Sequence, residues 1–274
     1  MFIEVESGVN LYVEDLRPQD GGNGHTLMFL HGWPGNHRVF DYAYQILPHH
    51  RFRCIGLDFR GFGKSDKPWH GYHYDRMAED LSVVIDMLDL KNVTLVGYSL
   101  GGSIAIRYMS KYHHGSKIDK LILVSAAAPA FAKREESSTY GIPLPMLDQL
   151  IDQLHQDLPQ AITDFSGTLF HRYVSPEYRN WFLHNCMESA SYALIQTAVA
   201  LRDEDLLEDM TYIEVPTGIF HGIHDQIVPF TAAVAIQQEI PGSLIYRFEQ
   251  SGHHLIYDEK ERFLSTLLSF LKNR

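Results

Sequence analysis

Cysteine is scarce in this 274-residue chain, which contains only Cys54 and Cys186. Cys54 lies in an apolar, strand-like run and Cys186 lies far downstream, so the two form neither a disulfide framework nor the paired spacing of a metal site. We expect both thiols to be reduced, buried and unreactive.

Basic residues are outnumbered: 23 Lys and Arg stand against 34 Asp and Glu, which gives a formal net charge of −11 at pH 7. This balance argues against nucleic acid and against an anionic membrane as partners. No apolar run reaches the roughly 18 residues that would suggest a membrane span. The segment Met1–Glu6 also lacks the basic start and apolar run of a signal peptide, so we expect a cytoplasmic protein.

Motifs for cofactors are missing as well. The 16 histidines include no H-E-x-x-H pattern, although His221 and His224 share a strand end and leave zinc as an alternative. Gly63-Lys64-Ser65 is similar to the end of a phosphate-binding loop, but Asp58 occupies the position of the required earlier glycine. We predict that the protein uses neither a metal nor any other cofactor.

Short apolar runs bounded by turn residues alternate with helical patterns along most of the chain. Buried strands are predicted at Thr26–Leu30, Phe52–Leu57, Val93–Gly97, Ile118–Val124, Thr217–Gly222 and Leu244–Phe248. Helices are predicted at Val39–Leu47, Tyr74–Leu90, Ser103–Tyr112 and Asp258–Leu271, and a hairpin at Phe2–Val5 and Leu11–Asp15. This alternation predicts the α/β class, with a mostly parallel central sheet covered by helices on both faces.

The alternation breaks between residues 130 and 210, where the sequence predicts no strand. Four helices are expected there, at Leu144–Leu154, Gln160–Leu169, Pro176–Cys186 and Ser189–Arg202. We interpret residues 130–210 as a helical cap inserted into one core, which residues 1–129 and 211–274 form together. The alternative is a set of extra packing helices with no role over a site.

The segment Gly97-Tyr98-Ser99-Leu100-Gly101-Gly102 follows a predicted strand and precedes a helical pattern, which is the context of a nucleophile elbow. A strand-to-helix turn this tight has no room for side chains at the glycine positions, and it lifts the serine hydroxyl clear of the sheet. Because Gly-x-Ser-x-Gly is common by chance, its surroundings must support Ser99 as a nucleophile.

The loop His31-Gly32-Trp33-Pro34-Gly35 follows an earlier strand and supplies part of that support. A developing oxyanion needs two donors, and we assign the backbone N–H groups of Trp33 and Leu100 to this role. The alternative is a plain glycine-proline turn in which His31 is structural.

Asp225 and His253 each follow a later predicted strand, so the chain order is Ser, Asp, His, as this type of site requires. We predict that His253 is the base and that Asp225 orients it. His253 is preferred over its neighbour His254 because it directly follows Gly252. His254 is expected to pack or to form hydrogen bonds nearby.

Together these motifs resemble those of α/β-hydrolases, over residues 24–132 and 213–272. The matching segments are His31-Gly32-Trp33-Pro34, Asp58-Phe59-Arg60-Gly61-Phe62-Gly63-Lys64-Ser65, Gly97-Tyr98-Ser99-Leu100-Gly101-Gly102, His221-Gly222-Ile223-His224-Asp225 and Gly252-His253. Within that superfamily the chain resembles the cofactor-free haloperoxidase, perhydrolase and arylesterase group. The His-Gly-Trp-Pro loop is also similar to that of epoxide hydrolases and haloalkane dehalogenases, but those enzymes have an aspartate nucleophile where this chain has Ser99.

These assignments predict a serine hydrolase that cleaves small carboxylic esters through an acyl-enzyme at Ser99. The resemblance implies a perhydrolase side activity without haem or metal. We expect Pro34 to orient the Trp33 carbonyl for that reaction, with simple stiffening of the turn as the alternative. A small-ligand receptor with a slow triad and a lyase on the same scaffold stay open as other functions.

The substrate pocket is expected to be apolar and to be built partly by the cap. Its candidate lining residues are Trp33, Pro34, Tyr98, Phe165, Phe170, Trp181 and Phe182. For each cap aromatic, ordinary core packing is an equally good interpretation. The cap carries no motif that identifies the acyl chain, the alcohol or the oligomeric state.

Overall fold

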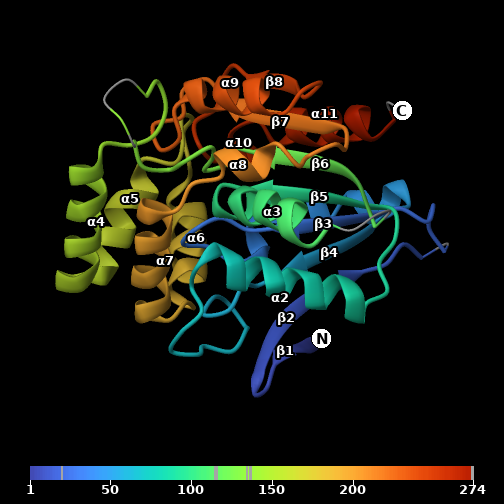
Figure 1. The fold of residues 1–274 in the computed structure, drawn as a ribbon, viewed down its shortest axis with the longest axis horizontal. Coiled ribbons are helices and arrows are strands. Elements are labelled where there is room, and N and C mark those ends of the chain that lie inside the picture. Colours follow the sequence, from blue (N-terminus) through green and yellow to red (C-terminus); the bar gives the residue numbers. More distant parts are fainter. Residues whose placement is uncertain (20, 114–116, 134, 136–137, 273–274) are drawn as a thin grey trace.

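The computed structural model describes residues 1–19, 21–113, 117–133, 135 and 138–272. Its strands form one sheet in the order β1-β2-β4-β3-β5-β6-β7-β8 (Figure 1). The strands are β1 (Phe2–Glu6), β2 (Val9–Leu16), β3 (Thr26–Leu30), β4 (Arg53–Leu57), β5 (Val93–Tyr98), β6 (Ile118–Val124), β7 (Thr217–Gly222) and β8 (Leu244–Phe248). Strands β3 to β8 run parallel, whereas β2 pairs antiparallel with both β1 and β4. The predicted hairpin and mostly parallel sheet are therefore confirmed.

The central strands are buried on both faces, which explains their nearly continuous apolar sequences. Every residue of β3, β5 and β7 is buried. In the parallel register, Leu30 of β3 lies beside Gly97 of β5, Tyr98 lies beside Val124 of β6, and Val124 lies beside Phe220 of β7. The residues that follow these strands consequently meet at one edge of the sheet.

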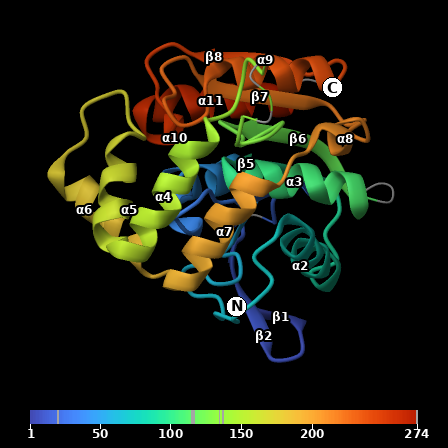
Figure 2. The same cartoon turned by 60° about the vertical axis from the view of Figure 1, so that its left-hand side comes forward.

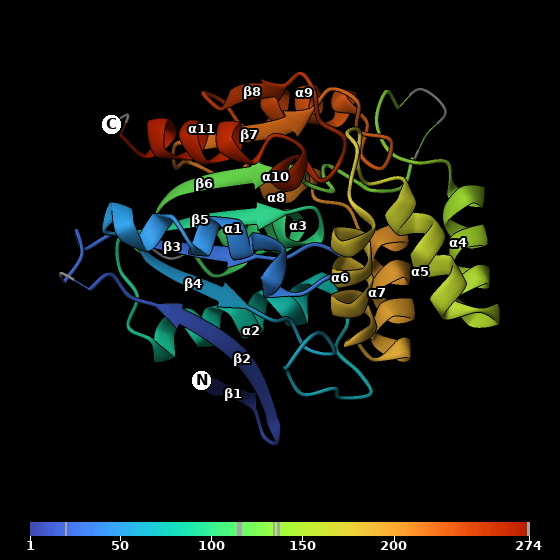
Figure 3. The same ribbon diagram turned by 180° about the vertical axis from the view of Figure 1, so that it is seen from behind.

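Helices cover both faces of the sheet. Helices α2 (Tyr74–Met87) and α3 (Leu100–Lys111) lie over the face seen in Figure 1, and α11 (Lys260–Lys272) with the short α1 (Asp41–Tyr44) lies over the face seen in Figure 3. The buried residues of α2 recur along one side, as a surface helix requires, and include Met77, Ala78, Leu81, Val84 and Ile85. No helix within the described residues is long and apolar enough to cross a membrane.

Four further helices lie together beyond the carboxyl ends of the parallel strands (Figure 2). They are α4 (Leu144–Gln156), α5 (Leu158–Gly167), α6 (Pro176–Met187) and α7 (Ser191–Asp203). The side chains of Asp157 and Ser175 accept hydrogen bonds at the starts of α5 and α6, where a proline also stands in the first turn. The four helices predicted within residues 130–210 are thus present, while residues 134 and 136–137 of that segment lie outside the described residues.

The prediction of one helix over Val39–Leu47 is wrong. The structure has a 3₁₀ turn at His37–Phe40, then α1, and then a second 3₁₀ turn at Leu47–His50. Pro48 has no N–H to donate to the preceding turn, so a regular helix cannot continue through this segment. Helix α2 likewise ends at Met87 rather than Leu90.

Three short helices are not predicted by the sequence: α8 (Leu207–Met210), α9 (Phe230–Glu239) and α10 (Leu255–Asp258). Helix α9 lies against β7 and buries mainly alanines. Alanine gives only a weak apolar periodicity, and for this reason the helical pattern of α9 is hard to recognise in the sequence.

Candidate active site

Ser99 lies at a sharp turn between β5 and α3, at the carboxyl edge of the sheet. Its backbone has φ 53° and ψ −117°, a conformation that residues other than glycine rarely adopt. A Cβ on Gly97 would lie 2.6 Å from the carbonyl oxygen of Gly101, and a Cβ on Gly101 would lie 2.2 Å from that of Leu30. The glycines therefore have the steric reason that the sequence predicted.

The loop that follows β3 passes directly beside Ser99. A Cβ on Gly32 would lie 2.9 Å from the Ser99 Cβ, so this close approach requires glycine. The peptide bond between Trp33 and Pro34 is cis. In the described part of the chain, the backbone N–H groups of Trp33 and Leu100 have no hydrogen-bond partner. Both donors are consequently available to a ligand oxygen, as an oxyanion hole requires.

Asp225 and His253 form a buried hydrogen-bonded pair at the same edge. The Nδ1 of His253 lies 2.8 Å from Oδ2 of Asp225. The other carboxylate oxygen, Oδ1, accepts hydrogen bonds of 2.8 Å from the N–H groups of both Ile227 and Val228. With one oxygen held by the backbone, the second oxygen is directed at the imidazole.

The electrostatics of this pair favour an ionised Asp225. Burial alone would raise the pKa of Asp225, but His253 and His221, which donate hydrogen bonds to it and are positive when protonated, lower it, and the net pKa lies well below its usual range. An ionised carboxylate accepts the His253 Nδ1–H. In its neutral form the imidazole then has its unprotonated nitrogen at Nε2.

His254 makes different contacts from its neighbour. Its Nδ1 lies 3.1 Å from the Tyr98 hydroxyl, and its Nε2 lies 3.2 Å from the hydroxyl of Tyr178 on α6. Burial and the adjacent His253 lower the pKa of His254 to about 3. The expectation that His254 packs and forms hydrogen bonds nearby is confirmed, and the ring connects the nucleophile turn to α6.

Asp258 ties the His253 loop to the linker between α5 and α6. Its Oδ2 accepts hydrogen bonds from the Gly252 N–H at 2.8 Å and from the His171 N–H at 2.9 Å. A Cβ on Gly252 would lie 2.9 Å from the carbonyl oxygen of Leu169, which belongs to the same linker. The helices beyond the sheet edge are therefore fastened directly to the loop that carries His253.

His31 has a structural role. Its Nε2 accepts a hydrogen bond of 3.1 Å from the Phe59 N–H, which places its proton on Nδ1, 3.0 Å from the Gly32 carbonyl oxygen. Burial lowers the pKa of His31 to about 4. The neutral ring thus holds the loop beside Ser99 against the loop that follows β4.

The segment resembling a phosphate-binding loop is also structural. Asp58 accepts hydrogen bonds from the N–H groups of His37 at 2.8 Å and Lys64 at 2.9 Å. Gly63 has φ 48°, and a Cβ there would lie 2.3 Å from Asp58 Oδ2. The backbone N–H of Lys64 therefore binds a carboxylate of the protein itself.

The proposed pocket residues fall into two groups. Trp33 and Phe165 pack edge to face, with ring centroids 4.9 Å apart, and the indole N–H of Trp33 donates to the Leu194 carbonyl oxygen at 3.1 Å. The two rings line a cavity of about 10 Å³, which is completed by Phe131, Leu147, Leu150, Ala198 and Leu201. This apolar cavity lies between the loop after β3 and helices α4, α5 and α7.

The remaining aromatic residues lie around His254. The Phe170 and Phe182 rings lie 5.3 and 5.4 Å from the His254 ring, and Tyr98 lies 5.4 Å from it. Trp181 instead stacks beneath the Arg38 guanidinium, 5.3 Å from its ring centroid. Pro34 is buried, and its carbonyl lies 3.5 Å from the hydroxyl of Ser189.

The sequence did not assign two residues of the site to the roles that they have in the structure. Tyr178 reaches His254 from α6, and His221 on β7 lies 3.3 Å from Asp225 Oδ2. Only the strand-end position of His221 gives a sequence signal, and that signal pointed to zinc.

His224, the other histidine of the zinc alternative, is exposed and stacks on His171 with ring centroids 3.7 Å apart. Over the described residues, no group of three or more metal-ligating side chains is placed to hold a metal ion.

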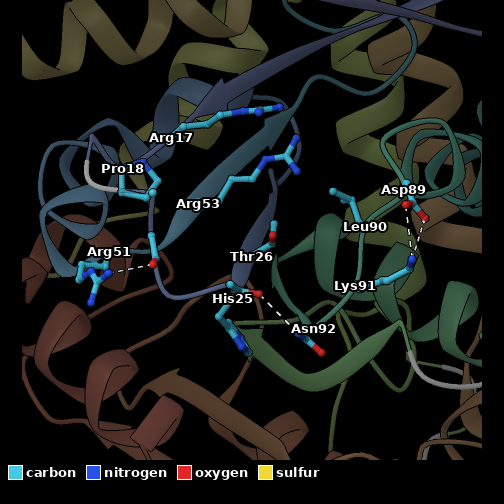
Figure 4. Close-up of a pocket in the computed structure, with 13 residues that line it drawn as sticks. Arg17, Pro18, His25, Thr26, Arg51, Arg53, Asp89, Leu90, Lys91 and Asn92 are labelled. Atoms are coloured by element: carbon cyan, nitrogen blue, oxygen red, sulfur yellow. Dashed lines mark hydrogen bonds and ion pairs between the residues drawn. The ribbon is translucent and has the colours of Figure 1, made fainter.

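A larger depression lies at the opposite edge of the sheet (Figure 4). Its volume is about 410 Å³, and its lining includes Arg17, Arg51, Arg53 and Lys91. Arg17 and Arg53 both donate to Asp15, Lys91 pairs with Asp89, and Arg51 donates to the Gly22 carbonyl oxygen. These cations are already paired, and the depression contains none of the site residues described above.

Comparisons with known proteins agree with this geometry. A family model for the α/β hydrolase fold matches residues 25–260. The chain is 46% identical over 269 residues to the AB hydrolase superfamily protein YisY of Bacillus subtilis (strain 168), with 98% of each protein covered. It is 29% identical over 281 residues to the bifunctional esterase/perhydrolase DCH of Acinetobacter calcoaceticus, with 99% of each covered.

A solved structure gives the same result. An esterase from Exiguobacterium antarcticum has 41% sequence identity and a TM-score of 0.95, and the match covers 100% of this chain and 99% of that one. The resemblance inferred from the motifs is confirmed, and the chain belongs to the α/β hydrolase fold family.

Proposed function

We propose that this protein is a serine hydrolase that cleaves small carboxylic esters through an acyl-enzyme on Ser99. The observation that carries the proposal is the 2.8 Å pairing of His253 Nδ1 with Asp225 Oδ2 at the edge where Ser99 has its positive φ. Similarity to a solved esterase supports the same conclusion. A serine hydroxyl becomes a competent nucleophile when an oriented imidazole can take its proton.

In the proposed acylation step, His253 Nε2 takes the Ser99 proton while Oγ forms a bond to the ester carbonyl carbon. The N–H groups of Trp33 and Leu100 bind the oxyanion, and loss of one such donor typically costs a factor of about 10²–10³ in rate. Collapse of the tetrahedral intermediate expels the alcohol, which receives the proton from His253.

Deacylation repeats the sequence with water as the nucleophile. His253 takes a proton from water as the oxygen attacks the acyl carbon, and it returns the proton to Ser99 when the acid leaves. Asp225 stays ionised throughout, because its pKa lies well below its usual range. Its role is to hold the imidazole tautomer and to stabilise the imidazolium.

Small substrates fit the observed packing best. Ser99 is only 5% exposed, and the cavity beside Trp33 has a volume of about 10 Å³. A cavity of this size holds at most about one water molecule, so every acyl or alcohol group must displace side chains of α4 and α5, and a long group must displace more of them than a short one. We therefore expect activity to fall as the acyl chain lengthens.

A series of p-nitrophenyl esters from acetate to decanoate tests the proposal. We expect sustained turnover that is fastest for the short esters and is lost in Ser99→Ala without a change in melting temperature. Sustained turnover by Ser99→Ala would overturn the assignment of the nucleophile. A single burst of product without turnover would favour the receptor function, and a trapped acyl-enzyme argues against a lyase.

A perhydrolase side activity is a second proposal for the same site. Similarity to the bifunctional esterase/perhydrolase supports it. The Trp33 carbonyl, which precedes Pro34, has no hydrogen-bond partner in the described part of the chain. Turned toward the acyl-enzyme, it would accept a hydrogen bond from hydrogen peroxide and align the attack on the acyl carbon.

Acetate buffer containing peroxide tests this second proposal. We expect formation of peracetic acid, and Pro34→Leu is expected to lower perhydrolysis more than ester hydrolysis. Equal loss of both activities would refute the role of Pro34. Absence of peracid from the parent enzyme would leave ester hydrolysis as the single proposal.

A further inference from the structure

A second histidine contacts the carboxylate oxygen that His253 uses. The ring of His221, on β7, is fully buried. Its Nε2 lies 2.8 Å from the carbonyl oxygen of Val228 and 3.3 Å from Oδ2 of Asp225. A carbonyl and an ionised carboxylate only accept hydrogen bonds, so the proton of the neutral ring must be on Nε2.

The contacts of His221 close a small ring with the acid. Val228 donates its N–H to Asp225 Oδ1 at 2.8 Å, while its carbonyl accepts from His221 Nε2. The same Nε2, whose hydrogen bond goes to Val228, also lies 3.3 Å from Asp225 Oδ2, so both oxygens of Asp225 are contacted by this ring of groups. This arrangement fixes the carboxylate rotamer in which Oδ2 points at His253.

Packing alone does not explain a histidine at this position. The edge of the His221 ring faces Phe230, with ring centroids 5.8 Å apart, as an apolar aromatic ring would also do. Its second nitrogen, Nδ1, is buried and has no hydrogen-bond partner within the described residues. A buried polar atom without a partner is unfavourable, so the benefit of histidine here must come from the Nε2–H.

We propose that His221 is a positioning residue for the ester hydrolysis, which orients Asp225 Oδ2 and shares its negative charge with His253. The inference rests on the proposed function, in which Asp225 holds the catalytic imidazole. Without the His221 donor, Oδ2 keeps only the bond from His253 and interacts more strongly with the imidazolium. The proton affinity of His253 then rises while the orientation of the carboxylate is weakened.

Two substitutions separate the donor from the shape of the ring. The amide N–H of His221→Gln replaces the Nε2–H, whereas His221→Phe fills the space without a donor. For hydrolysis of p-nitrophenyl acetate, we expect His221→Phe to lose a factor of about 10–100 in kcat with little change in KM, as for other residues that orient a ligating or catalytic group. We expect His221→Gln to keep a rate close to that of the parent.

The comparison of His221→Gln with His221→Phe is meaningful only if both variants fold, so their melting temperatures are measured first. If His221→Phe does not fold, His221→Leu takes its place in the same comparison. Equal loss of kcat in the glutamine and apolar variants would overturn the inference, because the donor would then be irrelevant.

A double-mutant cycle shows whether His221 acts through Asp225. We expect His221→Phe to cause almost no further loss of kcat in an Asp225→Asn background, where the charge it shares is gone. If the factors by which the two substitutions lower kcat multiply in the double variant, His221 acts independently of Asp225, and the inference is contradicted.

Titration of His253 by NMR gives a readout that does not depend on turnover. In the Ser99→Ala background, we expect the His253 midpoint to be higher with His221→Phe than with His221 or with His221→Gln. His254 and Tyr98, which are the other titratable groups that face His253, are the same in all three proteins. An unchanged midpoint overturns the role of His221, whereas a parent without esterase activity overturns only the proposed function.

Discussion

The carboxyl edge of the sheet, where the parallel strands end, and the amino edge, where they begin, hold their polar groups in opposite ways. At the carboxyl edge, Ser99, Asp225 and His253 are 5%, 7% and 1% exposed, and the paired side chains are fixed by hydrogen bonds of 2.8 Å. At the amino edge, Arg17 and Arg53 border an open depression of about 410 Å³ and share Asp15 as their partner (Figure 4).

The difference shows that the size of a depression does not locate the chemistry. At the amino edge, the oxygens of Asp15 are occupied by Arg53, which donates to both of them, and by the exposed Arg17, so no oriented polar group among the described residues there is left to act on a ligand. The carboxyl edge places few groups in a buried environment, where the pKa of Asp225 is lowered and the backbone holds the orientation of its carboxylate. Orientation and burial, rather than volume, identify the candidate site.

Removal of the nucleophile or the base is expected to cause the greatest loss of activity. Ser99→Ala and His253→Ala are each expected to lower kcat for p-nitrophenyl acetate by a factor of about 10⁶, the scale found when either member of a triad is removed. Steady-state kinetics measure the loss, with circular dichroism and melting temperature as controls for folding. Activity near the parent level in either folded variant would remove that residue from the mechanism.

The next largest effect concerns the acid. Asp225→Asn is expected to lower kcat by about 10⁴-fold, since an amide at this position favours the wrong imidazole tautomer. The backbone bonds from Ile227 and Val228 can still reach the side-chain oxygen of asparagine, so the fold should persist. Stopped-flow measurement of acylation separates this effect from product release, and a loss of only a few-fold would direct the search to another acid.

A smaller effect is expected at the neighbouring histidine. His254→Ala removes the link between Tyr98 and Tyr178, but it leaves the pair of His253 and Asp225 in place. We expect a loss of about tenfold or less in kcat, at or below the lower end of the factor of about 10–100 that is typical when an orienting residue is removed. Parallel assays of His253→Ala and His254→Ala rank the two residues, and the reverse order would identify His254 as the base.

His254 also predicts how stability depends on pH. Its native pKa of about 3 lies below the ordinary value of 6.5, so between these values the unfolded chain binds a proton that the native protein does not. Stability is therefore lost as pH falls through this window, by up to about 1.4 kcal/mol per pH unit for one proton. Urea unfolding at several pH values should show a shallower decline in His254→Phe, and identical slopes would contradict the assigned burial.

The smallest effect is expected at the amino edge. Arg53→Ala removes one of the two cations on Asp15, and we expect ester hydrolysis to stay within about twofold of the parent, with a stability loss of about 1 kcal/mol or less. The same kinetic assay and urea unfolding measure both quantities. A large loss of activity would show that the two edges are coupled and would contradict the difference described between them.

Local sequence signals predicted most of the sheet and the three proposed catalytic residues. Buried parallel strands have continuous apolar runs, and a turn as tight as the one at Ser99 requires glycines that are visible in the sequence. Because parallel strands end at one edge of the sheet, the positions of Asp225 and His253 after strand ends are enough to predict that both lie near Ser99.

The features that escaped prediction depend on contacts between distant segments. His221 faces Asp225 only because β7 and the following loop fold back on each other. Trp181 packs on Arg38 and Phe165 packs on Trp33, a difference that neither aromatic side chain reveals by its spacing in the sequence. Periodicity indicates which side of a helix is apolar, but it does not show what that side touches.

Trapping the acyl-enzyme tests the role of Ser99 as nucleophile most directly. The protein is mixed with p-nitrophenyl acetate, quenched with acid during turnover, digested and analysed by mass spectrometry, with Ser99→Ala treated in parallel. We expect one acetyl group on the peptide that contains Ser99 and none on the corresponding peptide of the variant. Turnover without any acylated peptide, or acetylation of a different residue that Ser99→Ala does not abolish, would contradict it.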